Sequence, residues 1–249
     1  MMNRKRLPTI SFLLCMALSC LAQRNEIFSP DIATLQVNNT QQRLSVLPVI
    51  QLGSDERIQI SFDCLGHEYH RFTYKITHCE ADWSTSTQLF DSDYLEGFGN
   101  NLLIEDIKES VNTNTEYTHY SLALPNAQCR MTLSGNYKVC IYDEANNLLL
   151  NACFMVVEPR MRIGLSYMTN TDIDINRAHQ QVEMKLDYGT LTVTDPGRQI
   201  KTVVLQNGTW NDARVNVQPQ YTRRDGLQWQ HCRGYIFEAG NVYRKFECL

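Results

Sequence analysis

Apolar and polar residues alternate with a period of two along most of the chain. Six runs share this pattern, and their apolar positions are Ile58, Ile60 and Phe62; Phe72, Tyr74 and Ile76; Tyr137, Val139 and Ile141; Leu150, Ala152, Phe154 and Val156; Met161, Ile163, Leu165 and Tyr167; and Val182, Met184, Leu186 and Tyr188. Each run offers one apolar and one polar face, as an antiparallel strand that covers one side of a core does. Helical periodicity is confined to one short candidate at 101–110. The pattern therefore predicts an all-β protein.

Turn residues separate the runs and set the size of the units. They are Leu52-Gly53-Ser54-Asp55, Asn146-Asn147, Asp195-Pro196-Gly197, Asn207-Gly208 and Asp225-Gly226. Residues 23–249 have room for two immunoglobulin-like β-sandwiches of about 100 residues each. We place the boundary at Glu158-Pro159, because proline has no N–H for a strand ladder. We expect tandem sandwiches over 23–158 and 159–249.

The first residues are typical of an export signal. Arg4, Lys5 and Arg6 precede an apolar run that ends at Ala22, and polar residues follow it. The run has about 11 residues, whereas a membrane-spanning helix needs roughly 20. We expect a signal peptide over 1–22, cleavage after Ala22 and no membrane span. Lipid attachment at Cys20 is the alternative, although Leu18 is bulky where a small residue is usual.

The charge of the chain argues against nucleic acid as a ligand. The formal net charge is −4, and the predicted signal holds three of the basic residues, so the exported part is more acidic still. No basic cluster after the signal is longer than Arg223-Arg224. Nucleic-acid binding depends on clustered Lys and Arg that neutralise phosphates, so we exclude this class.

The cysteines suggest one possible disulfide. The exported part has Cys64, Cys79, Cys129, Cys140, Cys153, Cys232 and Cys248, without the C-x-x-C spacing of zinc or redox sites. If Asn146-Asn147 is a two-residue turn, Ile141 faces Ala152, Val139 faces Phe154 and Tyr137 faces Val156. Cys140 then faces Cys153 at a Cα distance of about 4.5 Å, which a disulfide spans. The alternative is two unpaired thiols on the outer face of the hairpin.

Candidate chemistry is sparse. His67, His70 and His78 are possible zinc ligands of a metal-dependent hydrolase, but the helical H-E-x-x-H spacing is missing. Asp91, Asp93 and Glu96 lack the fixed separation of a glycosidase pair, and a solvated acidic loop explains them better. The sequence therefore predicts no catalytic residue, no metal and no cofactor.

The segment from His78 to Phe98 is too aromatic for an ordinary solvent loop and long for a hairpin connection. Asp82 is placed to hydrogen-bond the backbone of the turn after it. One interpretation is that Trp83 closes the open end of the first sandwich. The other is that the loop presents Trp83, Tyr94 and Phe98 to a protein partner, since aromatic residues dominate binding hot spots.

Several stretches in order along the chain resemble one known family. They are His78-Cys79-Glu80-Ala81-Asp82-Trp83, Tyr94-Leu95-Glu96-Gly97-Phe98, Tyr117-Thr118-His119-Tyr120, Leu122-Ala123-Leu124-Pro125-Asn126, Leu133-Ser134-Gly135-Asn136-Tyr137, Phe154-Met155-Val156-Val157-Glu158-Pro159, His179-Gln180-Gln181-Val182, Leu205-Gln206-Asn207-Gly208-Thr209-Trp210 and Ala239-Gly240-Asn241. Together they are similar to the plug protein of the type IX secretion system of Bacteroidetes.

The resemblance implies a non-enzymatic, periplasmic protein at the inner face of the outer membrane. Its implied partner is the translocon barrel, whose pore it seals or gates. Members of the family usually continue past the position of Leu249 with a further β-rich region, and the sequence leaves open whether this chain is complete or a fragment. A carbohydrate-binding or cell-surface adhesion module is the alternative, because it is also β-rich, aromatic and acidic.

Overall fold

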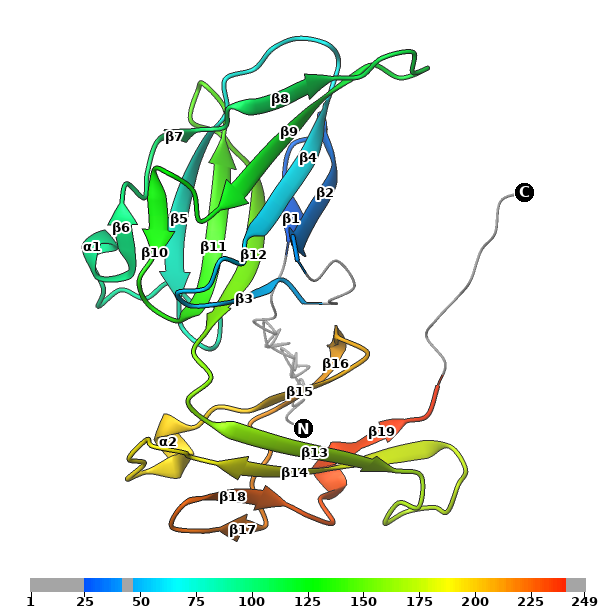
Figure 1. Ribbon diagram of the computed structural model, residues 1–249. Helices are drawn as coiled ribbons and strands as arrows, with labels where there is room; N and C mark the ends of the chain where they lie inside the picture. The colour runs from blue at the N-terminus through cyan, green and yellow to red at the C-terminus, as the bar shows by residue number, and fades with distance from the viewer. Residues whose placement is uncertain (1–24, 42–46, 241–249) are drawn as a thin grey trace, which may run out of the picture.

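The computed structural model describes residues 25–41 and 47–240 (Figure 1). The predicted signal over 1–22, with Cys20, lies outside the described residues, as does Cys248. Strands dominate, and the prediction of an all-β protein is confirmed. Within the described ranges, no helix has the length and apolar content that crossing a membrane requires.

Residues 26–157 form two sheets that share one core (Figure 1). The six-stranded sheet contains β1 (Glu26–Ile27), β3 (Val49–Gln51), β5 (Thr73–Cys79), β7 (Leu102–Leu103), β11 (Gly135–Tyr142) and β12 (Leu148–Val157). The four-stranded sheet contains β2 (Ile32–Asn39), β4 (Ile58–Leu65), β8 (Asp106–Glu109) and β9 (Tyr117–Leu124). We call this unit the N-terminal sandwich.

The core of the N-terminal sandwich follows the predicted alternation. Every second residue of β4 is buried, and β9, its neighbour in the sheet, has the same alternation. Phe62 stacks on Tyr120 with ring centroids 5.4 Å apart, and Phe72 of the facing layer lies 4.7 Å from Tyr120. Aromatic residues from both layers therefore hold the two sheets together.

The predicted hairpin register between β11 and β12 is wrong by two residues. Ile141 pairs with Leu150, Cys140 with Asn151, and Cys153 with Lys138. The turn is longer than two residues, because Asp143 closes it: its carboxylate accepts the backbone N–H of Asn147 at 2.7 Å. Cys140 and Cys153 therefore do not face each other across the strands. This removes the strand register on which the predicted Cys140–Cys153 disulfide depended.

The short helix predicted at 101–110 is also wrong. This segment contributes β7 to one sheet and β8 to the other. β8 pairs with β9, and Ile107 packs against the core from the edge of the four-stranded sheet. Pairing with an existing strand thus overrides the weak helical pattern.

Residues 162–238 form a second group of strands, which we call the C-terminal unit. Its main sheet contains β13 (Arg162–Met168), β14 (His179–Asp187), β17 (Tyr221–Thr222), β18 (Gly226–Trp229) and β19 (Ile236–Glu238). A hairpin of β15 (Val203–Gln206) and β16 (Thr209–Val215), the short helix α2 (Pro196–Gln199) and a 3₁₀ turn (Arg233–Tyr235) complete it. Its core gathers around Trp229 and Tyr235.

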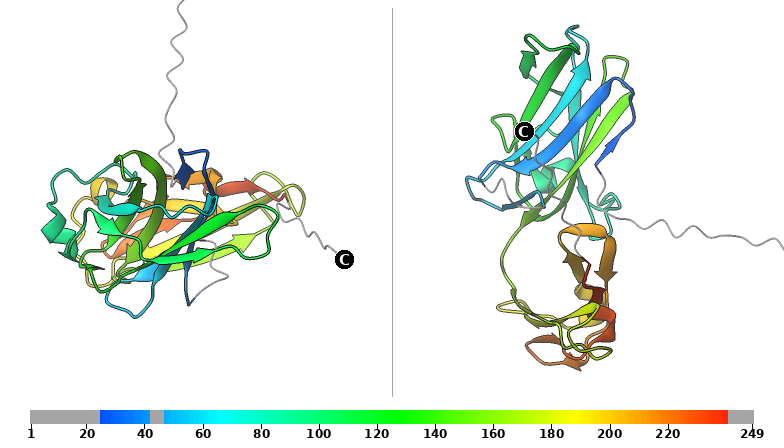
Figure 2. Two further views of the ribbon diagram at one scale, coloured as in Figure 1. Left: turned by 90° about the horizontal axis from the view of Figure 1, so that it is seen from above. Right: turned by 90° about the vertical axis from the view of Figure 1, so that its right-hand side faces the viewer.

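One described segment joins the two units (Figure 2). β12 ends at Val157 and β13 begins at Arg162. Within this connection the Arg160 guanidinium donates a hydrogen bond to Glu158 Oε1 at 3.0 Å. The predicted domain boundary at Glu158-Pro159 falls here and stays a prediction.

Replacing Phe62 by alanine should destabilise the N-terminal sandwich by about 3–5 kcal/mol, because it leaves a cavity between the sheets. Phe98→Ala removes the same atoms from an exposed site, so it should change the free energy of unfolding by less than about 0.5 kcal/mol. Urea denaturation followed by near-UV circular dichroism measures both. Equal losses for the two variants would contradict this assignment of the core.

Candidate partner-binding surface

Residues 80–101 leave the end of β5 and return through β7, and we call them the excursion. They contain the one-turn helix α1 (Asp91–Tyr94) and β6 (Leu95–Gly97), which pairs with β10 (Cys129–Met131). The excursion lies at the side of the N-terminal sandwich (Figure 1). It is a separate small layer held against a rigid body.

Tyr94 anchors the excursion to the sandwich. Its ring is buried, with centroids 6.1 Å from Tyr137 and 5.6 Å from His78. The Tyr94 hydroxyl donates to Asp91 Oδ1 at 2.6 Å, and the Tyr137 hydroxyl donates to the Leu133 carbonyl at 2.6 Å. Burial first, and the Asp91 carboxylate second, raise the pKa of Tyr94, so this phenol stays a neutral donor.

His78 is a structural member of the same anchor. Its Nδ1 lies 2.8 Å from the Ser86 hydroxyl, and its ring meets Tyr137 edge-on. Gly135 has a φ of +152°, and a Cβ there would overlap the imidazole. The strand therefore needs glycine at this point so that it can pass over the ring.

The three histidines of the hydrolase alternative are spread over the sandwich. His67 contacts Ser110, His70 stacks on Phe72, and His78 is buried in the anchor. No group of three His, Cys, Asp or Glu residues suited to a metal occurs in the part of the chain that the structure describes. The metal interpretation thus has no geometric support.

Trp83 does not close the end of the sandwich. It is buried on the outer face of the six-stranded sheet, where it clusters with Cys79, Cys153 and Met155. Asp82 shapes the turn as expected: its carboxylate accepts the Ser84 backbone N–H at 3.0 Å, and bonds from Ser84 lower the pKa of Asp82. Trp83 and Tyr94, two of the three predicted contact residues, are thus covered by the chain itself.

Two aromatic side chains of the excursion do face solvent. Phe98 is 73% exposed and Phe90 is 78% exposed. Each ring is the chain neighbour of one member of a close pair, since a Cβ added at Gly99, the residue after Phe98, would lie 3.7 Å from Oδ2 of Asp91, the residue after Phe90. Sequence reasoning missed Phe90. The available signal was Asp91-Ser92-Asp93, because acidic residues mark a first helical turn and place the residue before them at an open N-cap.

The excursion is strongly acidic. Its charged residues are Glu80, Asp82, Asp91, Asp93 and Glu96, and it has no Lys or Arg. All five are exposed, and Asp93 accepts the Phe90 backbone N–H at 2.8 Å, which fixes the start of α1. The surface therefore combines two exposed phenyl rings with several carboxylates, of which Glu96 stands opposite Arg130 of β10.

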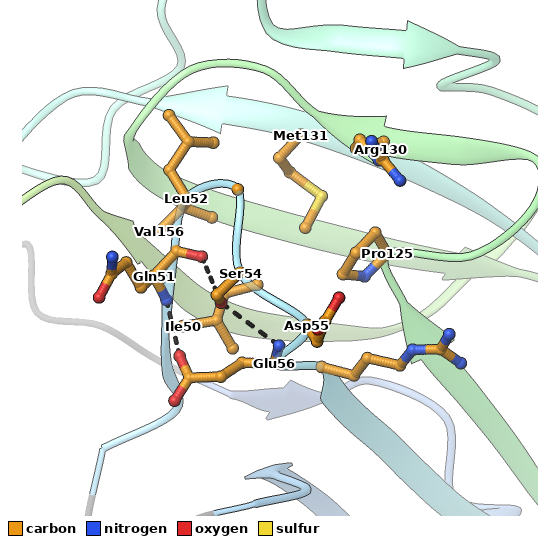
Figure 3. Close-up of a pocket in the computed structure, with 12 residues that line it drawn as sticks. Ile50, Gln51, Leu52, Ser54, Asp55, Glu56, Pro125, Arg130, Met131 and Val156 are labelled. Atoms are coloured by element: carbon orange, nitrogen blue, oxygen red, sulfur yellow. Dashed lines mark hydrogen bonds between the residues drawn. The ribbon is translucent and has the colours of Figure 1, made fainter.

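A cavity of about 430 Å³ lies beside the turn between β3 and β4 (Figure 3). The Gln51 backbone N–H donates to Glu56 Oε2 at 2.8 Å, and the Ser54 hydroxyl donates to the Gln51 carbonyl at 2.7 Å. These polar groups close the turn, with Arg130 and Met131 of β10 across the cavity (Figure 3). They do not form a catalytic arrangement.

Two histidine–aspartate pairs fasten the loop between β13 and β14. His179 Nδ1 lies 2.8 Å from Asp174 Oδ2, and His231 Nδ1 lies 2.9 Å from Asp172 Oδ1. Buried Gln181 holds Asp172 through two bonds of 2.8 Å. Hydrogen bonds from these partners raise the pKa of both histidines and lower the pKa of both aspartates.

Comparison with known proteins points to one family. A model of the first domain of the type 9 secretion system plug protein matches residues 32–158. A hypothetical protein from Parabacteroides merdae ATCC 43184, solved as a crystal structure, is 37% identical with a TM-score of 0.82. The match covers 88% of this chain and 55% of that protein, so this chain spans little more than half of that relative.

Another solved structure, an alkylpurine DNA glycosylase from Pseudomonas fluorescens, is 18% identical with a TM-score of 0.29, over 51% of this chain and 30% of that one. That likeness is too weak to compare folds. No significant match was found among curated proteins.

The stability of the C-terminal unit should fall as pH rises from about 6 to about 8. A raised histidine pKa means that the pairs stabilise the folded state below the ordinary value of 6.5, and that this stabilisation disappears as pH rises through the folded pKa. The lowered aspartate pKa values keep the pairs intact down to about pH 4.

Thermal unfolding followed by tryptophan fluorescence at both pH values measures this change. The double variant His179→Gln with His231→Gln should flatten the decline, whereas the control His70→Gln should retain it. A decline of the same size in the double variant would show that other groups cause it.

Proposed function

Because the chain belongs to the type 9 secretion system plug protein family, we propose that it seals the periplasmic end of the outer-membrane translocon pore. It would do so in the periplasm, at the inner face of the outer membrane, by binding the barrel without turnover. The single observation that supports a binding role is the exposed aromatic and acidic surface of the excursion.

A plug works by occupying space, so it needs a stiff body and a surface that holds it in place. The N-terminal sandwich supplies the first through a core that spans both sheets. The anchor at Tyr94 and Tyr137 keeps the excursion fixed against that body. Little conformational entropy is then lost when a partner binds, which favours affinity.

The chemistry of the surface indicates what the partner offers. Phe90 and Phe98 lose the most exposed area if they enter apolar pockets, and buried aromatic residues are common hot spots. Asp91, Asp93 and Glu96, which lie within three residues of these rings in the chain, favour a partner with Lys or Arg at the rim of those pockets. The proposed contact on the barrel is therefore apolar at its centre and basic around it.

Replacing Phe90 and Phe98 together by alanine should weaken binding to the translocon barrel by about 30-fold or more, since each hot-spot aromatic contributes over 1 kcal/mol. Co-purification with the tagged barrel from the envelope of the source bacterium, followed by titration in detergent, measures the change. Tyr69→Ala removes an exposed aromatic residue from another loop of the same sandwich and is the matched control.

Undiminished binding of the double variant would overturn the role of this surface. Binding of the unmodified protein to a polysaccharide instead of the barrel would favour the carbohydrate-binding alternative. Loss of binding in the Tyr69→Ala control as well would show that the effect is not specific to the excursion.

A further inference from the structure

β13 is an edge strand with an uncovered apolar face. Ile163, Leu165 and Tyr167 are 62%, 63% and 79% exposed. The register pairs them with Leu186, Met184 and Val182 of β14, whose side chains belong to the core of the C-terminal unit. Paired residues point to the same face of a sheet, so the three β13 side chains lie on the same face as the core of the C-terminal unit. Unlike their β14 partners, they are not covered by other residues of the described chain.

The backbone of β13 also has an open edge. The Tyr188 N–H donates to the Asp225 carbonyl, and the Ala239 N–H donates to the Ala178 carbonyl. Even-numbered residues of β14 therefore direct their backbone groups to β18 and β19, and odd-numbered residues of β14 direct theirs to β13. The odd-numbered residues of β14 pair with the even-numbered residues of β13, from Arg162 to Met168. The N–H and C=O groups of Ile163, Leu165 and Tyr167 thus point away from the sheet.

We propose that this edge pairs with the same edge of a second copy of the chain, antiparallel about a two-fold axis at Leu165. Leu165 then faces Leu165 of the second copy, and Ile163 faces its Tyr167. Each of these is a hydrogen-bonded pair, because these residues carry the outward backbone groups. All six apolar side chains lie on one face, and the two sheets become one.

Charges on the other face agree with this register. Gly164 faces Ser166 of the second copy. On the β14 strand of its own copy, Gly164 pairs with Lys185 and Ser166 pairs with Glu183. The two-fold axis therefore sets Lys185 of each copy in line with Glu183 of the other copy, with Gly164 and Ser166 between them. A Cβ at Gly164 would meet no atom within 4 Å, so the space over which the Lys185 side chain must reach is open.

Nothing on β13 blocks such pairing. Natural edge strands are protected by lysine, proline, bulges or inward charges, and β13 has only Arg162 at its first position. Arg162 faces Met168 of the second copy, so no like charges meet. A pair of seven-residue strands is smaller than the standard interface of about 1,600 Å², so the dimer is weak and depends on concentration.

Cysteine cross-linking tests the register. Leu165→Cys places two thiols opposite each other at a Cα distance of about 5.5 Å, within the range of a disulfide. Trypsin releases residues 163–177, a peptide without a native cysteine, so the linked peptide is diagnostic despite the other thiols. The matched control is Ile163→Cys. In the proposed register its two thiols are offset by four residues along the strand direction, which is about 13 Å and too far for a disulfide.

We expect the linked peptide from Leu165→Cys at least ten-fold more abundantly than from Ile163→Cys. In light scattering, the unmodified protein should change from monomer to dimer as its concentration rises, and Leu165→Lys should stay monomeric. If the unmodified protein is monomeric at every concentration, the proposal is overturned. Equal cross-linking of the two cysteine variants also overturns it. Because neither readout involves the barrel, their failure leaves the proposed plug function unaffected.

Discussion

The contact of Tyr94 with Tyr137 and His78 holds the excursion in one position against the N-terminal sandwich. Residues 80–101 have few strand partners of their own, since α1 is one turn and β6 has three residues. Burial of the Tyr94 ring among aromatic neighbours, with its hydroxyl bonded to Asp91, orders them together with the buried side chains of Trp83 and Leu95. Buried aromatic side chains contribute both apolar area and a polar group that fixes orientation. The burial of Tyr94 therefore fixes the helical turn whose neighbouring residues include the exposed Phe90 and Phe98.

The strands of this protein were predictable from the sequence because burial enforces alternation. β4, β5, β11 and β12 follow the predicted pattern, since one face of each covers the core. The register of β11 with β12 was not predictable in the same way. A shift of two residues leaves every side chain on its face, so hydrophobicity does not distinguish the two registers. Only the carboxylate of Asp143, which closes a longer turn, decides between them.

The candidate site was predictable in place but not in detail. An aromatic segment that follows a strand indicated the excursion, yet composition alone does not say which rings turn inward. Trp83 has a φ of +66° and packs against Cys153 and Met155 on the outer face of a sheet, a position that depends on a strand distant in sequence. Phe90 is exposed because Asp93 caps the turn behind it. Both outcomes follow from tertiary contacts that no local pattern encodes.

The two proposed contacts use different physical forces, and this matters for how the protein can assemble. The excursion offers side chains, with carboxylates that attract a basic partner at long range and phenyl rings that need shaped pockets. β13 offers backbone groups beside an apolar row, so its contact needs a strand in register rather than a complementary charge field. Salt weakens the first interaction much more than the second. The residues of the two contacts belong to separate units joined by one short connection. A second copy held along β13 would therefore add a second set of rings to the assembly, and two linked weak contacts bind more tightly than either alone when the geometry allows both.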